Sequence, residues 1–153
     1  MEIKIKNFQV RDFVDFLHGL PIKGAKLSRM RTRILRHASS YVSDKLVPEL
    51  NVIVDKYAET EDGIPLINGN GGIEWKPETA QKAMEEMDAI DNEYYYLECD
   101  SFMKDAIIGI GEYLLDNEDV ILEGNIATFF DGWCEQFELA IEHYAKREIE
   151  KEG

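Results

Sequence analysis

The sequence predicts an α+β fold that is predominantly helical, with four to five helices and a small β-hairpin or three-stranded sheet. Three observations support this class. Apolar residues recur at spacings of three and four over long stretches, which is the period of an amphipathic helix. Two short segments, Met1–Lys6 and Glu93–Cys99, alternate apolar residues or are rich in aromatics, as strands are. A glycine-rich turn separates two short apolar runs, which is typical of a hairpin.

The N-terminal third is expected to hold an extended segment and two helices. Apolar and basic residues alternate over Met1–Lys6, which predicts a short strand or arm. Asn7 is expected to cap a helix that Gly19 and Pro21 end. An apolar stripe over 27–57 predicts a long second helix, with Ser28 as a possible cap. Pro48 interrupts it and predicts a kink or restart, because proline removes a hydrogen bond and clashes with the preceding turn.

Thr60–Pro77 breaks the helical pattern. The apolar runs Ile64–Ile67 and Ile73–Trp75 flank the glycine-rich segment Asn68–Gly72, which favours a β-hairpin, with an irregular surface loop as the alternative. A P-loop is disfavoured because no Lys-Ser/Thr follows the glycines.

The remaining elements follow from the same patterns. We expect a helix from Pro77 to Ile90, followed by a strand over Glu93–Cys99 that could pair with the hairpin. A second helix is expected from Asp100 or Ser101 to Leu115, with Phe102 inward. A short strand at Val120–Leu122 and a long helix capped by Asn125 should follow. Trp133 is expected in the core between this last helix and the long second helix. The charged tail Lys146–Gly153 is expected to fray.

Length and composition indicate one globular domain, residues 1–153. The N-terminus has no apolar region of a secretory signal, and no apolar run is long enough to cross a bilayer. Cys99 and Cys134 lie in separate predicted elements without a nearby base, so we expect buried structural thiols. These features predict a cytoplasmic protein with reduced thiols and no membrane contact.

The charge is unevenly distributed. The formal net charge is −14, with ten Lys/Arg against five Asp/Glu in residues 1–50 and seven against 26 in residues 51–153. The two parts therefore carry +5 and −19. An acidic chain of this kind resists non-specific nucleic-acid binding, although a dense carboxylate array can also imitate a nucleic-acid backbone.

No pattern of residues predicts catalysis, a metal site or a cofactor. Asp15 and His18 share a helical face but lack further ligands of matching geometry, and Glu-x-x-His pairs are absent. His37 stands among arginines, which disfavours cation binding. The many carboxylates favour a solvated face over an acid–base pair. We therefore expect a protein that is not an enzyme.

The strongest local signal is a basic segment without acids, formed by Lys23, Lys26, Arg29, Arg31, Arg33 and Arg36. Arg29, Arg33 and Arg36 share one helical face by their spacing. Such a stripe could meet phosphates, the protein's own acidic helices, or those of a second copy. An exposed stripe in the folded protein favours nucleic acid, and a stripe buried against acidic helices favours a structural role.

The order of several motifs resembles a family of small proteins of unknown function from phages and prophages of Gram-positive bacteria. The residues that carry the resemblance are Lys-Gly-Ala-Lys-Leu-Ser-Arg-Met-Arg-Thr-Arg at 23–33, Lys-Tyr-Ala-Glu at 56–59, Asp-Gly-Ile-Pro at 62–65, Gly-Gly-Ile-Glu-Trp at 71–75 and Cys-Glu-Gln-Phe-Glu at 134–138. The resemblance implies the cytoplasm of an infected or prophage-bearing bacterium. It implies no catalytic residues.

The functional prediction is a non-enzymatic phage accessory protein that binds a host or phage protein. An anti-defence inhibitor of the anti-CRISPR kind is its most specific form. The alternative is a nucleic-acid-binding module that acts through Lys23–Arg36. A homodimer is also expected, with the basic segment of one copy against the acidic helices of the other.

Overall fold

The computed structural model describes residues 1–152. Over these residues it confirms the predicted class, with five helical segments and two antiparallel sheets of two strands each. The helices are α1 (Asn7–Gly19), a continuous run of α2 (Ala25–Tyr41), η1 (Val42–Leu46) and α3 (Val47–Tyr57), then α4 (Ala80–Asp91), α5 (Lys104–Asp116) and α6 (Gly124–Glu152). The strands are β1 (Glu2–Lys6), β2 (Thr60–Glu61), β3 (Ile64–Pro65) and β4 (Tyr94–Glu98).

The main sheet joins the N-terminal strand to the aromatic strand. β1 and β4 pair antiparallel, with Ile3 opposite Leu97 and Ile5 opposite Tyr95, and these four side chains are buried. The prediction that 93–99 pairs with the glycine-rich hairpin is wrong. The alternation of β1 gives it one apolar face, and pairing with β4 buries that face together with the inner face of β4.

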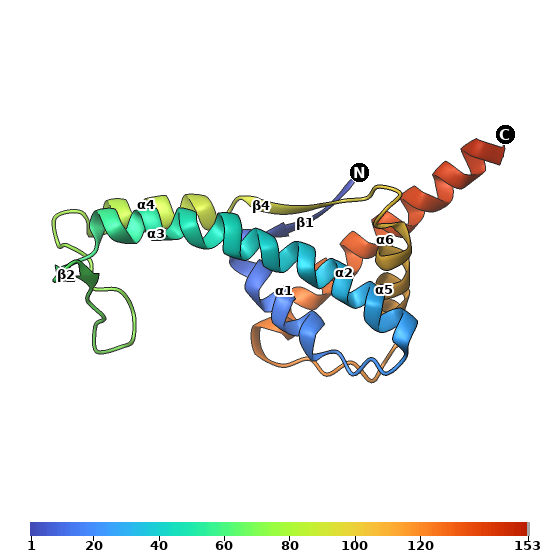
Figure 1. Ribbon diagram of the computed structural model, residues 1–153, viewed down its shortest axis with the longest axis horizontal. Helices are drawn as coiled ribbons and strands as arrows, with labels where there is room; N and C mark the ends of the chain where they lie inside the picture. The colour runs from blue at the N-terminus through green and yellow to red at the C-terminus, as the bar shows by residue number, and fades with distance from the viewer. Residues whose placement is uncertain (153) are drawn as a thin grey trace.

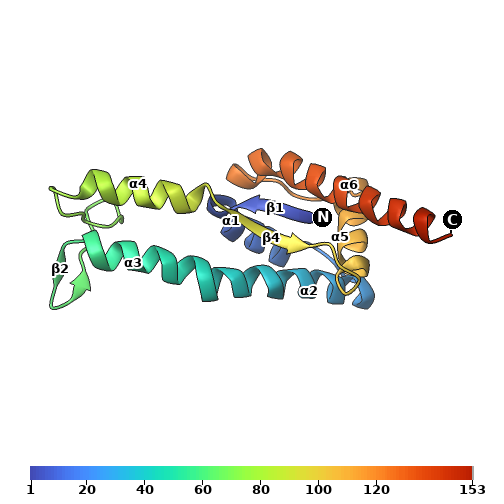
Figure 2. The ribbon, with the colours of Figure 1, turned by 90° about the horizontal axis from the view of Figure 1, so that it is seen from above.

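The main core lies beneath this sheet. Seen from above, the two strands run between α2 on one side and α6 on the other, while α1 lies below them (Figure 2). Phe13, Ile34, Ile107 and Phe137 are fully buried and come from four different helices. Burial of this aromatic and aliphatic surface is the dominant stabilising term for the body of the protein.

Trp133 is buried at 2% exposure, as predicted, but its partners differ from the prediction. Its ring centroid lies 5.2 Å from that of Phe13 and 5.5 Å from that of Phe16, both on α1. Its indole N–H donates to Gln9 Oε1 at 3.1 Å. Trp133 therefore fixes α6 against α1 rather than against the long second helix.

The long helical run continues through the region where Pro48 predicted a kink or restart. The turn before the proline widens into a π-helix, η1, and the Val47 N–H bonds to Val42 O across it. A proline lacks the N–H of an α-helical bond and its ring crowds the carbonyl of the previous turn. The wider turn accommodates the ring, so α2 and α3 remain one rod (Figure 1).

The part of the chain that projects from the body is termed the arm here and comprises residues 47–93. It consists of α3, α4 and the segment that joins their far ends (Figures 1 and 2). Its own small cluster contains buried Ile53, Tyr57 and Ala83, with Trp75 among the partly buried residues around it. The arm thus has far fewer buried side chains in its core than the body has.

The tip of the arm differs in detail from the predicted hairpin. The regular hairpin joins β2 to β3 through Asp62 and Gly63, which both have positive φ, as a tight two-residue turn requires. The runs around the glycine-rich segment are joined only by an isolated bridge between Ile67 and Ile73. Short strands without a buried face on either side do not extend into a longer ladder.

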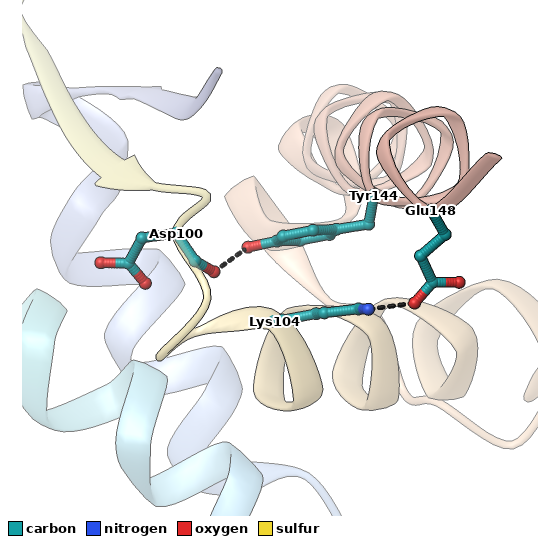
Figure 3. A network of polar contacts seen from close by, with 4 residues as sticks. All are labelled: Asp100, Lys104, Tyr144 and Glu148. Atoms are coloured by element: carbon teal, nitrogen blue, oxygen red, sulfur yellow. Dashed lines mark hydrogen bonds and ion pairs between the residues drawn. The ribbon is translucent and has the colours of Figure 1, made fainter. Parts of the chain in front are cut away.

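Three smaller predictions are also corrected. Val120–Leu122 lies in a loop and not in a strand. Asn7 is the first residue of α1 but makes no cap bond, because its side chain donates to Ile90 O and accepts from the Tyr41 hydroxyl. The tail remains helical to Glu152, and an ion pair from Lys104 to Glu148 holds it against α5 (Figure 3).

Candidate functional site

The candidate site lies on the outward face of α2. The helix buries Ile34 and Ala38 in the main core, so the opposite face must meet solvent. That face carries, at helical spacing, Ser28, Arg29, Thr32, Arg33, Arg36, His37 and Ser40. These positions repeat every three or four residues, which aligns their side chains along one side of the helix.

Together with a neighbouring loop, this face forms an open groove of about 650 Å³. The second wall is the turn between β4 and α5, which contributes Phe102 and Met103. Met103 is buried and anchors the turn, whereas Phe102 is 67% exposed. The prediction that Phe102 points inward is therefore wrong. The turn at 101–103 precedes α5, so Phe102 does not follow the inward face that Ala106 and Ile110 share.

Arg33 ties the two walls of the groove together. Its guanidinium donates to the backbone carbonyl of Phe102 at 3.1 Å and lies 4.7 Å from the centroid of the Phe102 ring. Both contacts use the planar shape of the guanidinium, which stacks on a ring and directs its N–H groups in the plane. The ring of Phe102 is thereby held at the mouth of the groove.

The six predicted basic residues divide into two groups. Arg29, Arg33 and Arg36 are brought together in the groove, as their spacing predicted. Arg31 is turned away and donates to Leu20 O at 2.7 Å, where it closes the connection between α1 and α2. Lys23 and Lys26 are exposed near the start of the helix and do not line the groove.

Carboxylates do not neutralise this group of cations within the described chain. Two ion pairs occur among residues 1–152, Lys56 with Glu86 and Lys104 with Glu148, and neither involves the basic segment. No acid lines the groove. Asp100, on the turn just before Phe102, accepts a hydrogen bond from the Met103 N–H at 2.8 Å. The backbone carbonyl of Asp100 accepts from the Tyr144 hydroxyl (Figure 3).

The groove also contains residues outside the predicted basic segment. Ser28, Thr32 and Ser40 add hydroxyl groups beside the arginines. His37, which stands among the arginines in the sequence, lines the groove, and its Nδ1 lies 2.6 Å from the Tyr95 hydroxyl. The spacing of the hydroxyl residues along the helix was visible in the sequence. The contribution of Phe102 was not, because it comes from a distant segment.

Two other features carry no chemistry that the structure supports. In the glycine-rich segment, Asn68 Oδ1 accepts from the N–H groups of Asn70 and Gly72, which are the groups that a phosphate would need. Cys99 and Cys134 are free and buried, as predicted, and burial raises the pKa of both thiols. Within residues 1–152, no three His, Cys, Asp or Glu side chains gather as a metal site requires.

Comparisons with family models, curated proteins and solved structures found no match to this chain. The resemblance to small phage proteins therefore stays a prediction. Among the helices described, none combines the length and the apolar character that crossing a membrane requires.

Proposed function

We propose that this chain is a non-enzymatic binding protein that takes single-stranded nucleic acid in the α2 groove. The observation that carries the proposal is the convergence of Arg29, Arg33 and Arg36 in a groove that no carboxylate lines. Arg29 and Arg36 are exposed, and charge-assisted hydrogen bonds from guanidinium groups to phosphate oxygens are among the strong ones, so this group is suited to an anionic ligand. Because the arginines of the groove are not buried against acidic helices, we favour nucleic acid over a protein partner as the ligand of the groove.

The composition of the groove favours nucleic acid over an acidic protein segment. Ser28 and Ser40 add hydroxyl donors beside the guanidinium groups, while the Thr32 hydroxyl donates to Ser28 O at 2.9 Å and offers its oxygen only as an acceptor. Arginine, serine and threonine are among the side chains that contact phosphate and sugar oxygens. Protein interfaces are also enriched in arginine and aromatic residues but are depleted in serine, so Ser28 and Ser40 are the residues that favour nucleic acid here.

The exposed ring of Phe102 favours a single strand over a duplex. Unpaired bases stack on aromatic side chains, and each such contact contributes about 1–3 kcal/mol to affinity. Bases inside a duplex do not present their faces. The net charge of −14 opposes binding of any polyanion. At physiological ionic strength charges are screened beyond about 8 Å, so the groups that line the groove dominate the interaction.

The test is fluorescence anisotropy with a labelled single-stranded oligonucleotide over a range of salt concentrations. Each phosphate neutralised contributes about −0.7 to the slope of log affinity against log salt for single strands, so three arginines contribute about −2. The variant Arg29→Glu/Arg33→Glu/Arg36→Glu should lose binding. The matched control Lys82→Glu/Lys146→Glu/Lys151→Glu makes the same charge change away from the groove and should retain most of it. Equal binding by both variants would contradict the proposal.

A second candidate function is supported by the arm. Large apolar side chains are exposed along it: Ile64 and Ile67 at 69% and 61%, with Val52 and Met84 at 64% and 55%. Grouped exposed apolar residues mark protein-binding surfaces. On this reading the chain is a phage accessory protein that binds a host or phage protein in the bacterial cytoplasm, with an anti-CRISPR-like inhibitor as the most specific form.

The arm hypothesis has its own experiment. The wild-type protein and Ile64→Ser/Ile67→Ser are used as baits in the same host lysate, because these exposed changes should leave the fold intact. A partner retained by the wild type and lost by the variant supports the arm as the docking site. A plaque assay with and without a defence system in the host tests the anti-defence form.

A further inference from the structure

The outer face of the β1–β4 sheet carries two exposed tyrosines. The strands alternate, so Ile3, Ile5 and Leu97 point into the core while Tyr94 and Tyr96 point out, with 39% and 47% of their surfaces exposed. Seen from above, the two strands lie open between the long helix and α6 (Figure 2). Among residues 1–152, α6 reaches the edge of this face, where the Lys4 N–H donates to Gln136 Oε1 at 2.9 Å, and the two tyrosine rings stay partly exposed.

Lysines stand directly across from these rings. Lys6 pairs with Tyr94 and Lys4 with Tyr96 in the strand register. Lys6 Nζ lies 6.0 Å from the centroid of the Tyr94 ring. The centroids of the two tyrosine rings are 6.1 Å apart, and their planes are inclined by 42°. The rings are thus neighbours without being stacked face to face, which leaves ring surface available to a ligand.

The tyrosine face and the α2 groove are built on the same strand. Tyr95, between the two outward tyrosines, contacts His37 of the groove through its hydroxyl at 2.6 Å. Its ring also lies 5.0 Å from that of Tyr41, one residue beyond Ser40 at the end of the groove. After β4 the chain passes directly into the turn that carries Phe102. The groove and the tyrosine face thus share β4, with Tyr95 turned into the core and Tyr94 and Tyr96 on the opposite side of the strand.

We propose that Tyr94 and Tyr96 form a stacking site for unpaired nucleobases, which extends the single-strand site of the α2 groove onto the sheet. This inference rests on the proposed function of the groove. The rings supply the stacking faces, and Lys4 and Lys6 supply cations for the phosphates that flank the bases. Aromatic faces combined with cations are what single-strand sites use when they bind without sequence preference.

The acids nearby set the limits of this site. Glu2 and Glu98 stand opposite each other at the far end of the sheet, and Glu93 immediately precedes Tyr94. These carboxylates repel phosphates, so the contact is confined to the central register pairs between them. On this face, base stacking should therefore contribute more to the binding free energy than phosphate contacts do, whereas in the groove the phosphate contacts should contribute more.

The experiment separates bases from backbone. Binding of a short oligothymidylate is compared with binding of an abasic oligomer that has the same number of phosphates. Tyr94→Ala/Tyr96→Ala should weaken oligothymidylate binding at least about fivefold, the lower end for loss of one stacked base, and leave the abasic oligomer and the salt slope unchanged. Tyr94→Phe/Tyr96→Phe keeps both rings and should bind as the wild type does.

The outcomes are distinguishable. If the wild type binds neither oligomer, the proposed function of the groove fails and this inference fails with it. If the groove variant Arg29→Glu/Arg33→Glu/Arg36→Glu loses binding while Tyr94→Ala/Tyr96→Ala binds both oligomers as the wild type does, only the tyrosine site is overturned. An equal loss for both oligomers in the alanine variant also overturns it. The single change Tyr96→Ala serves if the double variant fails to fold.

Discussion

The guanidinium of Arg33 stacks on the ring of Phe102 and donates to the carbonyl of the same residue. One side chain on α2 thus positions a residue sixty-nine places away in the sequence. Met103 anchors the turn in the core and the Tyr144 hydroxyl holds Asp100 O, while Arg33 fixes Phe102 itself on the groove side.

The first prediction compares Arg33→Lys with Arg29→Lys. Lysine keeps the charge but has neither the planar stack nor the fork of donors, so Arg33→Lys should loosen the turn at 101–103. Amide exchange in that turn should accelerate, while oligonucleotide affinity falls several-fold with an unchanged salt slope. Arg29 makes no such contact, so Arg29→Lys should leave exchange unaffected. Identical exchange in the two variants would argue against a positioning role for Arg33.

The second prediction concerns two glycines of α5. A methyl group at Gly109 would meet the flexible end of Met30, whereas one at Gly111 would lie 2.9 Å from Ile141 Cδ1 and 3.2 Å from Phe137 Cδ1. Alanine in a helix interior is favoured over glycine by up to about 1 kcal/mol. Gly109→Ala should therefore be neutral or stabilising, and Gly111→Ala should destabilise by about 1–3 kcal/mol through overpacking. Urea denaturation measures both, and equal effects would contradict the packing of α5 on α6.

The third prediction concerns thiol reactivity. Burial raises the pKa of Cys99, and burial together with Asp131 and Glu138 raises the pKa of Cys134 to about 11. Only the thiolate reacts with alkylating reagents, so both thiols should be nearly inert near neutral pH in the native state and reactive in denaturant. A thiol whose pKa is raised on folding favours the folded state below its unfolded pKa. That contribution should be lost as pH rises from about 9 to about 11. Rapid labelling of native protein at neutral pH would contradict these environments.

The sequence was sufficient where periodicity alone decides the structure. Apolar spacing predicts α1, α5 and α6 as helices, and the class follows from them, although the start of α5 and the helical tail after Lys146 differ from the prediction. The sequence was insufficient where the residues that contact each other are far apart along the chain. The alternation of β1 shows which side chains turn inward but not which strand lies beside it, and β4 satisfies its hydrogen bonds from ninety residues away. Pro48 predicted an irregularity in the helix but not its form, which is the π-helical turn Val42–Leu46.

The candidate site divides in the same way. Arg29, Arg33 and Arg36 could be placed on one face because residues three and four apart align on a helix. That Arg31 turns to Leu20 O depends on the loop after α1, which spacing does not describe. The prediction that Phe102 lies in the core assumes a helix that begins at Asp100 or Ser101, whereas α5 begins at Lys104 and Phe102 lies in the turn before it.

The fourth prediction concerns the arm. Only Ile53, Tyr57 and Ala83 are buried in its cluster, so it should open without unfolding the body. Ile53→Ala should raise amide exchange throughout 47–93 and leave β1 and α5 protected. The matched change Ile107→Ala in the main core should cost about 2–5 kcal/mol of global stability. Uniform exchange of the whole chain after Ile53→Ala would mean that arm and body unfold together.

The last prediction concerns self-association. Residues 1–50 carry +5 and residues 51–153 carry −19, and the arginines of the groove have no carboxylate partner within the described chain. A second copy is a source of such carboxylates, since the arm carries many more acids than bases. Two long helical runs packed antiparallel would place the basic end of each beside the acidic end of the other, in the two-fold arrangement that is commonest for homo-oligomers. We therefore expect a homodimer whose affinity falls with salt.

Sedimentation at low and high salt measures this dimer, with Arg29→Glu/Arg33→Glu as the disrupting variant. Oligonucleotide should dissociate the dimer, because both compete for the same arginines. A monomer at low salt would remove the dimer, and a dimer indifferent to salt and to charge reversal would mean that another surface forms it.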